Sequence, residues 1–371
     1  TGSIYQRPDG TWAAQVRMGT DPKTGKPKKK TFYDKDRKKL EEKLRNFVIL
    51  FEAGEYFECT FTLEEWLNIW LENSKNAYKN TTWDSYRLMA KKHIIPELGG
   101  YLLNKITTGH IQVFINDKMN TSGLASRSVR YLIQILNQAF KQAVAERKIR
   151  YNPVEAVIQP KLKSRKGKAL ELEDFEKLMA KIKTSKDRIL FITEIMTGLR
   201  RGELLGLYKE DLDFNKKLIY ITKSLVRTSE GLKLQSPKTE SSIRTIPMPE
   251  LLEEELKKQL IVQEIALNRP MTNKDFVFAR QDGYPRDPRG VTKHFQTLIK
   301  QAGIEHTTFH DLRHTHSTYM LLEMDIDMKT AQNNLGHSTV ETLMNIYSHG
   351  LDHKRIEAAA KISDFYKKYL K

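Results

Sequence analysis

The sequence predicts a mainly α-helical chain with small β-sheets (α+β), and three observations support this. Short runs that alternate apolar and polar residues lie between residues 3 and 34, separated by turn residues. A helical periodicity then runs from Thr60 to about Gln159, and it resumes at Ala169 apart from strand patterns between Leu218 and Met248. We expect a domain at 1–57, a helical domain at 58–159, a linker at 160–168 and a mixed α/β domain at 169–371.

The composition indicates a polyanionic partner. The 371 residues carry 63 Lys and Arg against 46 Asp and Glu, a formal net charge of +17, and the sequence pI is about 9.6. The single cysteine, Cys59, cannot form a disulfide within the chain, which suits a reducing compartment. No run of eighteen apolar residues and no signal-peptide pattern is present, so we expect a cytoplasmic protein without a membrane partner.

The first segment has the pattern of three strands followed by one helix. Pro8 to Gly10 and Asp21 to Pro27 separate the strand patterns, and apolar residues recur at helical spacing from Lys35 to Ala53. Positive charge gathers around the third strand, at Lys26, Lys28, Lys29 and Lys30. Two interpretations stay open: a basic hairpin that is only solvated, and a sheet that enters the major groove of DNA.

The second segment has four helical stretches. Thr62 to Glu65 has the capping-box pattern that begins a helix. Further helices are predicted at 81–93, at 107–119 and at 126–148. Pro96 and the Gly99-Gly100 pair are expected to end the first of these. Their apolar stripes are expected to form a core. Candidate phosphate contacts are basic and hydroxyl residues at helix starts and turns, namely Lys79, Thr81, Lys91, Lys92, Arg127, Ser128 and Arg130.

The stretch from Pro160 to Lys168 predicts an interdomain linker. It is basic, contains Pro and Gly, and has few apolar residues. We expect Lys163, Arg165 and Lys166 to contact DNA where the linker crosses it.

Two features of the last segment place cations at corners of the fold. Gly198 breaks an apolar helical run, which puts Arg200 at a helix–turn–helix corner with Glu203 in reach to brace it. The stretch from Leu232 to Met248 has the alternation of a β-hairpin, with Lys238 at its exposed tip.

A second cluster of polar residues lies near the C-terminal end. His310 and Arg313 are three apart and share a face if the segment is helical, and His337 and Tyr347 follow. A tyrosine hydroxyl beside such donors suggests nucleophilic attack on a phosphate. The alternatives are a half-buried packing tyrosine and a helical metal site formed by His310 with His314.

These motifs carry a resemblance. TGLRRGELLGL, a lysine before an R-x-I-P strand, HDLRH, LGHS and IYSH occur in the order typical of the tyrosine recombinases, the phage-type integrases, and the chain resembles this family. The resemblance implies an arm-site-binding domain, a core-binding domain and a catalytic domain in that order. It also implies an active-site set, each member of which matches in residue type: Arg200, Lys238, His310, Arg313, His337 and Tyr347.

The resemblance further implies the chemistry. Tyr347 would attack the scissile phosphorus and form a 3′-phosphotyrosine, and Lys238 would protonate the departing 5′-oxygen. The two arginines would neutralise the non-bridging oxygens, and the histidines would hydrogen-bond the phosphate. No metal, ATP or other cofactor is implied.

The partners that the resemblance implies are double-stranded DNA, at arm and core sites of a mobile element, and further copies of the chain. The family works as a tetramer through a Holliday junction, with accessory DNA-bending or directionality factors, near the bacterial nucleoid. A predicted helix at 353–371 either packs on a neighbouring protomer or on its own domain. A phage and a conjugative transposon fit the layout equally. The alternatives to a recombinase are a type IB topoisomerase and a non-cleaving DNA-binding regulator.

Overall fold

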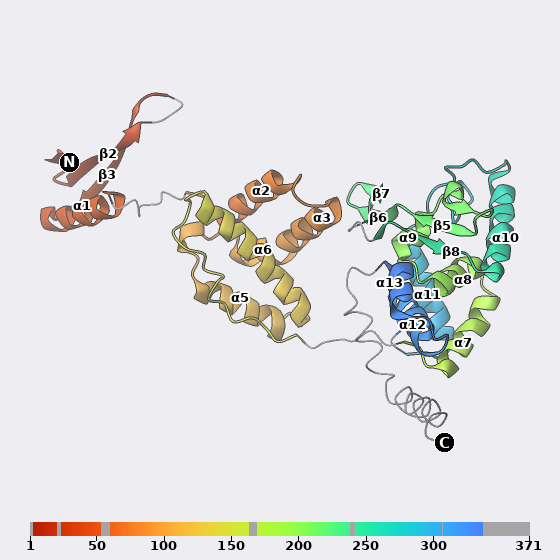
Figure 1. Ribbon diagram of the computed structural model, residues 1–371. Helices are drawn as coiled ribbons and strands as arrows, with labels where there is room; N and C mark the ends of the chain where they lie inside the picture. Colours follow the sequence, from red (N-terminus) through yellow and green to blue (C-terminus); the bar gives the residue numbers. More distant parts are fainter. Residues whose placement is uncertain are drawn as a thin grey trace, which may run out of the picture. The chain divides into compact units, whose positions relative to one another are not determined.

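The computed structural model describes residues 3–20, 24–52, 60–162, 169–237, 242–305 and 307–336 (Figure 1). The chain divides into two compact units, Thr1–Lys163 and Ser164–Lys371. The mainly helical fold with small sheets is confirmed. The finer division of the first unit at residue 57 stays a prediction. No helix among the described residues is long and apolar enough to cross a membrane.

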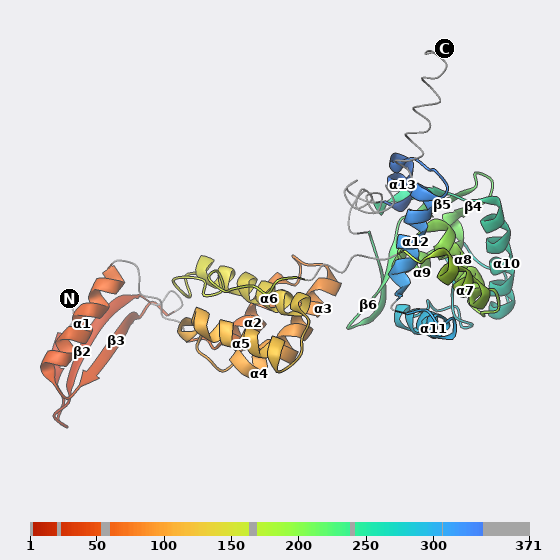
Figure 2. The ribbon, with the colours of Figure 1, turned by 90° about the horizontal axis from the view of Figure 1, so that it is seen from below.

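The first unit begins with the predicted three strands and helix. Strands β1 (Ser3–Gln6), β2 (Trp12–Thr20) and β3 (Pro27–Asp34) form an antiparallel sheet in the order β1-β2-β3. Helix α1 (Arg37–Glu52) runs along one face of this sheet, as Figure 2 shows. The ring of Phe32 on β3 packs against Phe47 of α1, with 4.9 Å between centroids. Among the elements of residues 3–52 that the structure describes, none covers the opposite face of the sheet, which we call the open face.

Helices form the rest of the first unit. They are α2 (Leu63–Ser74), α3 (Asn80–Met89), a π-helical turn (Ala90–Ile94), α4 (Ile95–Leu98), α5 (Thr108–Asn120) and α6 (Ser126–Ala145). The predicted capping box at Thr62 is present, since the Thr62 hydroxyl accepts from the Glu65 amide at 3.2 Å. Trp66 is buried in the core and donates its indole N–H to the Ala139 carbonyl, 2.9 Å away. The indole of Trp66 therefore ties α2 to α6.

The prediction that the second of these helices ends before Pro96 was wrong. The chain stays helical through Pro96 to Leu98, because the π-helical turn shifts the hydrogen bonding just before it: the Ile95 amide donates to the Ala90 carbonyl, five residues back. Pro96 then lies in the first turn of α4, where a missing N–H costs little. The Gly99 amide still reaches the Ile95 carbonyl at 2.9 Å, so the helix ends at the predicted glycines.

The second unit combines helices with two small sheets. Its helices are α7 (Leu172–Lys183), α8 (Arg188–Thr197), α9 (Arg201–Leu205), α10 (Glu250–Leu267), α11 (Pro288–Gln301), α12 (Phe309–Leu322) and α13 (Met328–Leu335). Its strands are β4 (Leu212–Asp213), β5 (Leu218–Ile221), β6 (Ser224–Thr228), β7 (Gly231–Gln235) and β8 (Arg244–Pro247). The sheets have the orders β4-β5-β8 and β6-β7.

The predicted hairpin from Leu232 to Met248 was wrong, because its two strands belong to different sheets. β7 pairs with β6 across a tight turn, where Gly231 adopts a left-handed φ of 115° and the Glu230 amide donates to the Thr228 hydroxyl. β8 instead pairs with β5, which places the buried Ile219 opposite the buried Ile246. Lys238 therefore follows the β6-β7 hairpin along the chain, in a segment outside the described residues.

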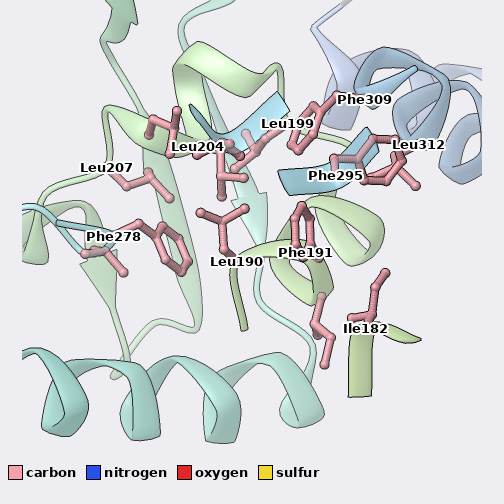
Figure 3. Packing of buried hydrophobic residues seen from close by; sticks show 14 of the residues in the cluster. Ile182, Leu190, Phe191, Leu199, Leu204, Leu207, Phe278, Phe295, Phe309 and Leu312 are labelled. Atoms are coloured by element: carbon pink, nitrogen blue, oxygen red, sulfur yellow. The ribbon is translucent and has the colours of Figure 1, made fainter. Parts of the chain in front are cut away.

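The core of the second unit holds the elements that carry the predicted site. Phe191 of α8, Phe295 of α11 and Phe309 of α12 pack ring against ring, with centroids 5.5 to 6.3 Å apart (Figure 3). Leu199 and Leu312 lie in the same core and are fully buried. Because each of these leucines directly precedes an arginine of interest, the core fixes the backbone from which Arg200 and Arg313 extend.

Candidate active site

Arg200 lies at the corner that the sequence predicts, between α8 and α9. Gly198 ends α8 in the left-handed conformation, with φ 58°. A Cβ on this glycine would lie 2.5 Å from the His316 ring, so only glycine fits the close approach of α12. Arg200 directly precedes α9 as its N-cap residue, and its guanidinium Nη1 donates to Glu203 Oε1 at 2.8 Å. The predicted brace by Glu203 is present.

Glu203 is buried and holds two arginines. Its Oε2 accepts from the Arg200 amide at 3.0 Å and from Arg244 Nη2 at 2.9 Å. Burial alone would raise the pKa of this carboxyl, but the charges of Arg244 and Arg200 and their hydrogen bonds lower it below its usual range. Glu203 is therefore an anion that fixes the orientation of Arg200.

Arg313 of α12 is almost fully buried, and both terminal nitrogens of its guanidinium donate to backbone carbonyls. Its Nη1 donates to the Gly198 carbonyl at 2.5 Å, and its Nη2 donates to the Leu335 carbonyl at 2.6 Å. Burial and the neighbouring Arg200 lower the pKa of Arg313 to about 9, which leaves it a cation at neutral pH. Arg200 and Arg313 also donate to the carbonyls of two successive residues, Gly336 and Leu335, so the two predicted arginines lie near each other.

His310 belongs to the same electrostatic neighbourhood. It lies one turn before Arg313, in the first turn of α12, and keeps contact with solvent. Partial burial, then His314 and then the two arginines lower its pKa, so the neutral ring is favoured at pH 7. The His314 ring packs edge-on against it at 5.0 Å. Within the described residues, no three His, Cys, Asp or Glu side chains gather as potential metal ligands.

The remaining predicted catalytic residues, Lys238, His337 and Tyr347, lie outside the described residues. The backbone leading to His337 is described. Gly336, directly before it, ends α13, and its carbonyl accepts from Arg200 Nη2 at 3.3 Å.

Sequence reasoning missed Arg244 as a member of this site. Its guanidinium contacts Glu203 and is buried, with 6% of the side chain exposed. The R-x-I-P strand was recognised, but its arginine was treated only as a strand residue. The available signal was strand alternation, since Arg244 lies two residues before the apolar Ile246 and therefore points to the same, buried face of β8.

The predicted DNA contacts of the N-terminal sheet lie on two faces. Lys29 lies on the open face, where its Nζ is 3.4 Å from Gln15 Oε1. Lys30 lies on the helix-covered face, with its Nζ 5.6 Å from the centre of the Phe47 ring. Lys26 precedes β3, and Lys28 is on β3 itself; both are exposed. Strand alternation therefore separates Lys29 from Lys30.

The DNA contacts predicted in the helical part of the first unit lie on different elements. Arg127, Ser128 and Arg130, near the start of α6, line a hollow of about 470 Å³ together with Ser85, Met89, Tyr131, Gln134 and Leu162. Arg127 is exposed, whereas Arg130 Nε donates to the Pro160 carbonyl at 2.8 Å. Lys79 precedes α3, Thr81 is in its first turn, and Lys91 and Lys92 are exposed in the π-helical turn. Lys163, Arg165 and Lys166 lie outside the described residues.

Comparison with known sequences finds two matching families. Residues 168–354 match the Phage integrase family, and residues 62–119 match the Phage integrase N-terminal SAM-like domain. A tyrosine recombinase XerC-like protein of Caldanaerobacter subterraneus subsp. tengcongensis is 29% identical and covers 95% of both chains. The ICEBs1 integrase of Bacillus subtilis is 28% identical over 98% of this chain and 99% of its own.

Solved structures share the fold. The Tn1549 transposon integrase in complex with a circular intermediate DNA superposes with a TM-score of 0.70 at 23% identity, covering 81% of this chain and 99% of that one. A lambda integrase tetramer bound to a Holliday junction superposes with a TM-score of 0.59 at 22% identity, covering 91% and 95%.

The histidines of α12 predict that the second unit loses stability in mild acid. Burial lowers the pKa of His316 to about 4. The unfolded chain therefore binds this proton more readily, so stability falls as the pH drops from about 6.5 towards 4. The expected loss at pH 5 from His316 alone is roughly 2 kcal/mol.

Calorimetry of the full chain at pH 7.5 and pH 5 measures this loss. The His316→Asn variant, which has no titrating ring at this position, is expected to lose less stability between the two pH values than the wild type. An equal loss in both proteins would contradict the assignment to His316.

Proposed function

The chain belongs to the phage integrase family of tyrosine recombinases and is a site-specific recombinase, and we propose that it acts through a covalent 3′-phosphotyrosine intermediate at the site described above. One observation carries this proposal: the guanidinium groups of Arg200 and Arg313, from different elements, converge on the backbone directly before His337. Two such cations, held in place by protein oxygens, can bind a phosphate group.

The reaction assigns one role to each residue. The Tyr347 hydroxyl oxygen attacks the scissile phosphorus, a bond forms between them, and the bond from phosphorus to the 5′-oxygen breaks. Lys238 gives a proton to the departing 5′-oxygen, so a free 5′-hydroxyl leaves. Attack by a 5′-hydroxyl of another strand reverses these steps and restores the tyrosine. The phosphodiester energy is kept in the phosphotyrosine, so no ATP enters the reaction.

Arg200 and Arg313 neutralise the charge that builds up on the non-bridging oxygens. Arg200 is suited to direct contact because 39% of its side chain is exposed while Glu203 holds one end of the guanidinium. Arg313 is buried and acts at short range in a poorly solvated environment, where a charge interacts strongly. His310, whose neutral form is favoured, hydrogen-bonds the phosphate and accepts the tyrosine proton; His337 is assigned a second hydrogen bond.

The first unit provides the proposed contacts to double-stranded DNA. Helix α1 covers one face of the sheet, so the open face is the one available to a DNA groove. This face presents Tyr5, Gln15, Arg17, Lys29 and Tyr33, which the strand register places side by side. The hollow at the start of α6 and the basic linker provide the contacts to the core site. Arm and core sites of a mobile element are the proposed targets.

The stoichiometry of the reaction supports a tetramer. Exchange between two duplexes breaks four strands, and each chain supplies one proposed nucleophile, Tyr347. Four copies on a Holliday junction satisfy this count, and the tail at 353–371 is proposed to link neighbouring copies. The reaction would take place in the bacterial cytoplasm, at the nucleoid, with accessory DNA-bending and directionality factors as further partners.

Two other functions remain distinguishable by experiment. A type IB topoisomerase relaxes supercoils without a particular sequence, whereas the recombinase requires its own sites. A regulator binds DNA and leaves no covalent complex. Two observations favour the recombinase. Arg200, His310 and Arg313 have the residue types of the recombinase motif, and the guanidinium groups of the two arginines converge on neighbouring carbonyls.

We expect a nicked suicide duplex that carries the end of the element to trap the protein covalently, since the released 5′ fragment diffuses away. Tyr347→Phe removes the nucleophile and abolishes the covalent band on a denaturing gel. Arg200→Ala lowers the single-turnover rate by about 10²–10³-fold. The matched control is Arg188→Met. Arg188 also pairs with a buried glutamate, Glu255, and its substitution should leave the rate unchanged. A duplex that the wild type binds without forming the band would contradict the proposal and favour the regulator.

Because Lys29 and Lys30 lie on opposite faces of the N-terminal sheet, we predict that their substitutions change the salt dependence of DNA binding differently. Lys29→Ala removes a cation from the open face, so the slope of log K against log salt for a duplex of arbitrary sequence should decrease by about 1. Lys30→Ala removes a cation from the helix-covered face and should leave the slope unchanged. Fluorescence anisotropy over a salt series measures both slopes. Equal slopes for the two variants would contradict the assignment of the open face.

A further inference from the structure

We propose that Arg244 is a positioning residue of the active site, which orients the phosphate-binding Arg200 through Glu203 without contacting the DNA. This inference rests on the proposed function. Arg244 begins β8, on the strand that pairs with β5, and only 6% of its side chain is exposed. A guanidinium this deeply buried requires a partner for each of its groups, and Arg244 has one on every nitrogen.

The three nitrogens of Arg244 donate to three separate parts of the second unit. Nε donates to the Asn334 carbonyl at 2.7 Å, and Nη2 donates to Glu203 Oε2 at 2.9 Å. Nη1 donates to the Ser242 carbonyl at 3.1 Å. Ser242 is the first described residue after the segment that contains Lys238. One side chain therefore joins the carboxylate that orients Arg200, the end of α13, and the chain that leads out of the Lys238 segment.

Arg244 is also one of three arginines that hold the C-terminal end of α13. The carbonyls of Asn334, Leu335 and Gly336, which follow one another in the chain, accept from Arg244, Arg313 and Arg200 respectively. Such carbonyls carry the partial negative charge of a helix terminus, which cations stabilise. His337 is the next residue. The geometry thus couples the backbone before one proposed catalytic histidine to both proposed catalytic arginines.

Only an arginine can make this set of contacts. Its planar guanidinium presents donors in three directions at fixed angles, whereas a lysine presents one nitrogen on a flexible stem. Loss of Arg244 would leave Glu203 with Arg200 as its only described ionic partner and free the end of α13. Because small displacements of catalytic groups cost up to about 10²-fold in rate, this loss should slow the chemical step.

The test measures single-turnover formation of the covalent complex on the suicide duplex, together with DNA affinity. Arg244→Met should lower the rate by about 10²-fold with unchanged affinity, since the residue does not contact DNA. Arg244→Lys, which keeps the charge and perturbs folding least, should also be slowed. The control is Arg188→Met, which loses an ion pair with another buried glutamate, Glu255, at the opposite end of α8 from Arg200 and should retain the wild-type rate.

A double variant tests whether Arg244 acts on the rate through Arg200 or independently of it. If Arg244 acts through the Glu203–Arg200 pair, Arg200→Lys combined with Arg244→Met should be about as slow as Arg200→Lys alone. Losses that multiply, a loss of DNA affinity, or wild-type rates in both Arg244 variants would overturn the proposal. A wild-type protein that binds the duplex without forming the complex would instead overturn the proposed function, and the role of Arg244 with it.

Discussion

The buried carboxylate of Glu203 holds the site together, because two arginines from different elements depend on it. It binds the backbone and guanidinium of Arg200 on one side and Arg244 on the other. A buried ion pair adds little net stability, but removal of one partner leaves an uncompensated charge in the interior. The arrangement therefore restricts where Arg200 can lie. The hydrophobic core also restricts the positions of the two proposed catalytic arginines, because the buried Leu199 and Leu312 fix the backbone beside them.

The charge balance of the cluster explains why it would attract a phosphate. Arg200, Arg244 and Arg313 bring three positive charges, and Glu203 supplies one negative charge. A second buried carboxyl, Glu194, does not restore the balance, because burial raises its pKa well above the usual range and favours the neutral form. Among the described side chains, the cluster thus has an excess of positive charge. A phosphodiester on the exposed side of Arg200 would compensate it at close range.

Local patterns predicted much of the fold and part of the site. The three strands, helix α1, the capping box at Thr62 and the corner at Arg200 each depend on residues close in sequence, so the sequence was sufficient. Strand pairing was not predictable in this way. The alternation of apolar and polar residues in β8 is compatible with pairing to β7 or to β5. The observed pairing with β5 buries Ile246 opposite Ile219. Arg244 was missed for the same reason, since two of its three partners lie 41 and 90 residues away.

The central claim is that the two guanidinium groups neutralise charge on the scissile phosphate. The most direct measurement compares the wild type with Arg200→Ala on two suicide duplexes, one with a normal phosphate and one with an uncharged methylphosphonate at the scissile position. If Arg200 compensates the charge of a non-bridging oxygen, the ratio of the two proteins' cleavage rates should be about 10²–10³ on the phosphate and at least about tenfold smaller on the methylphosphonate. An identical ratio on both duplexes would contradict the account.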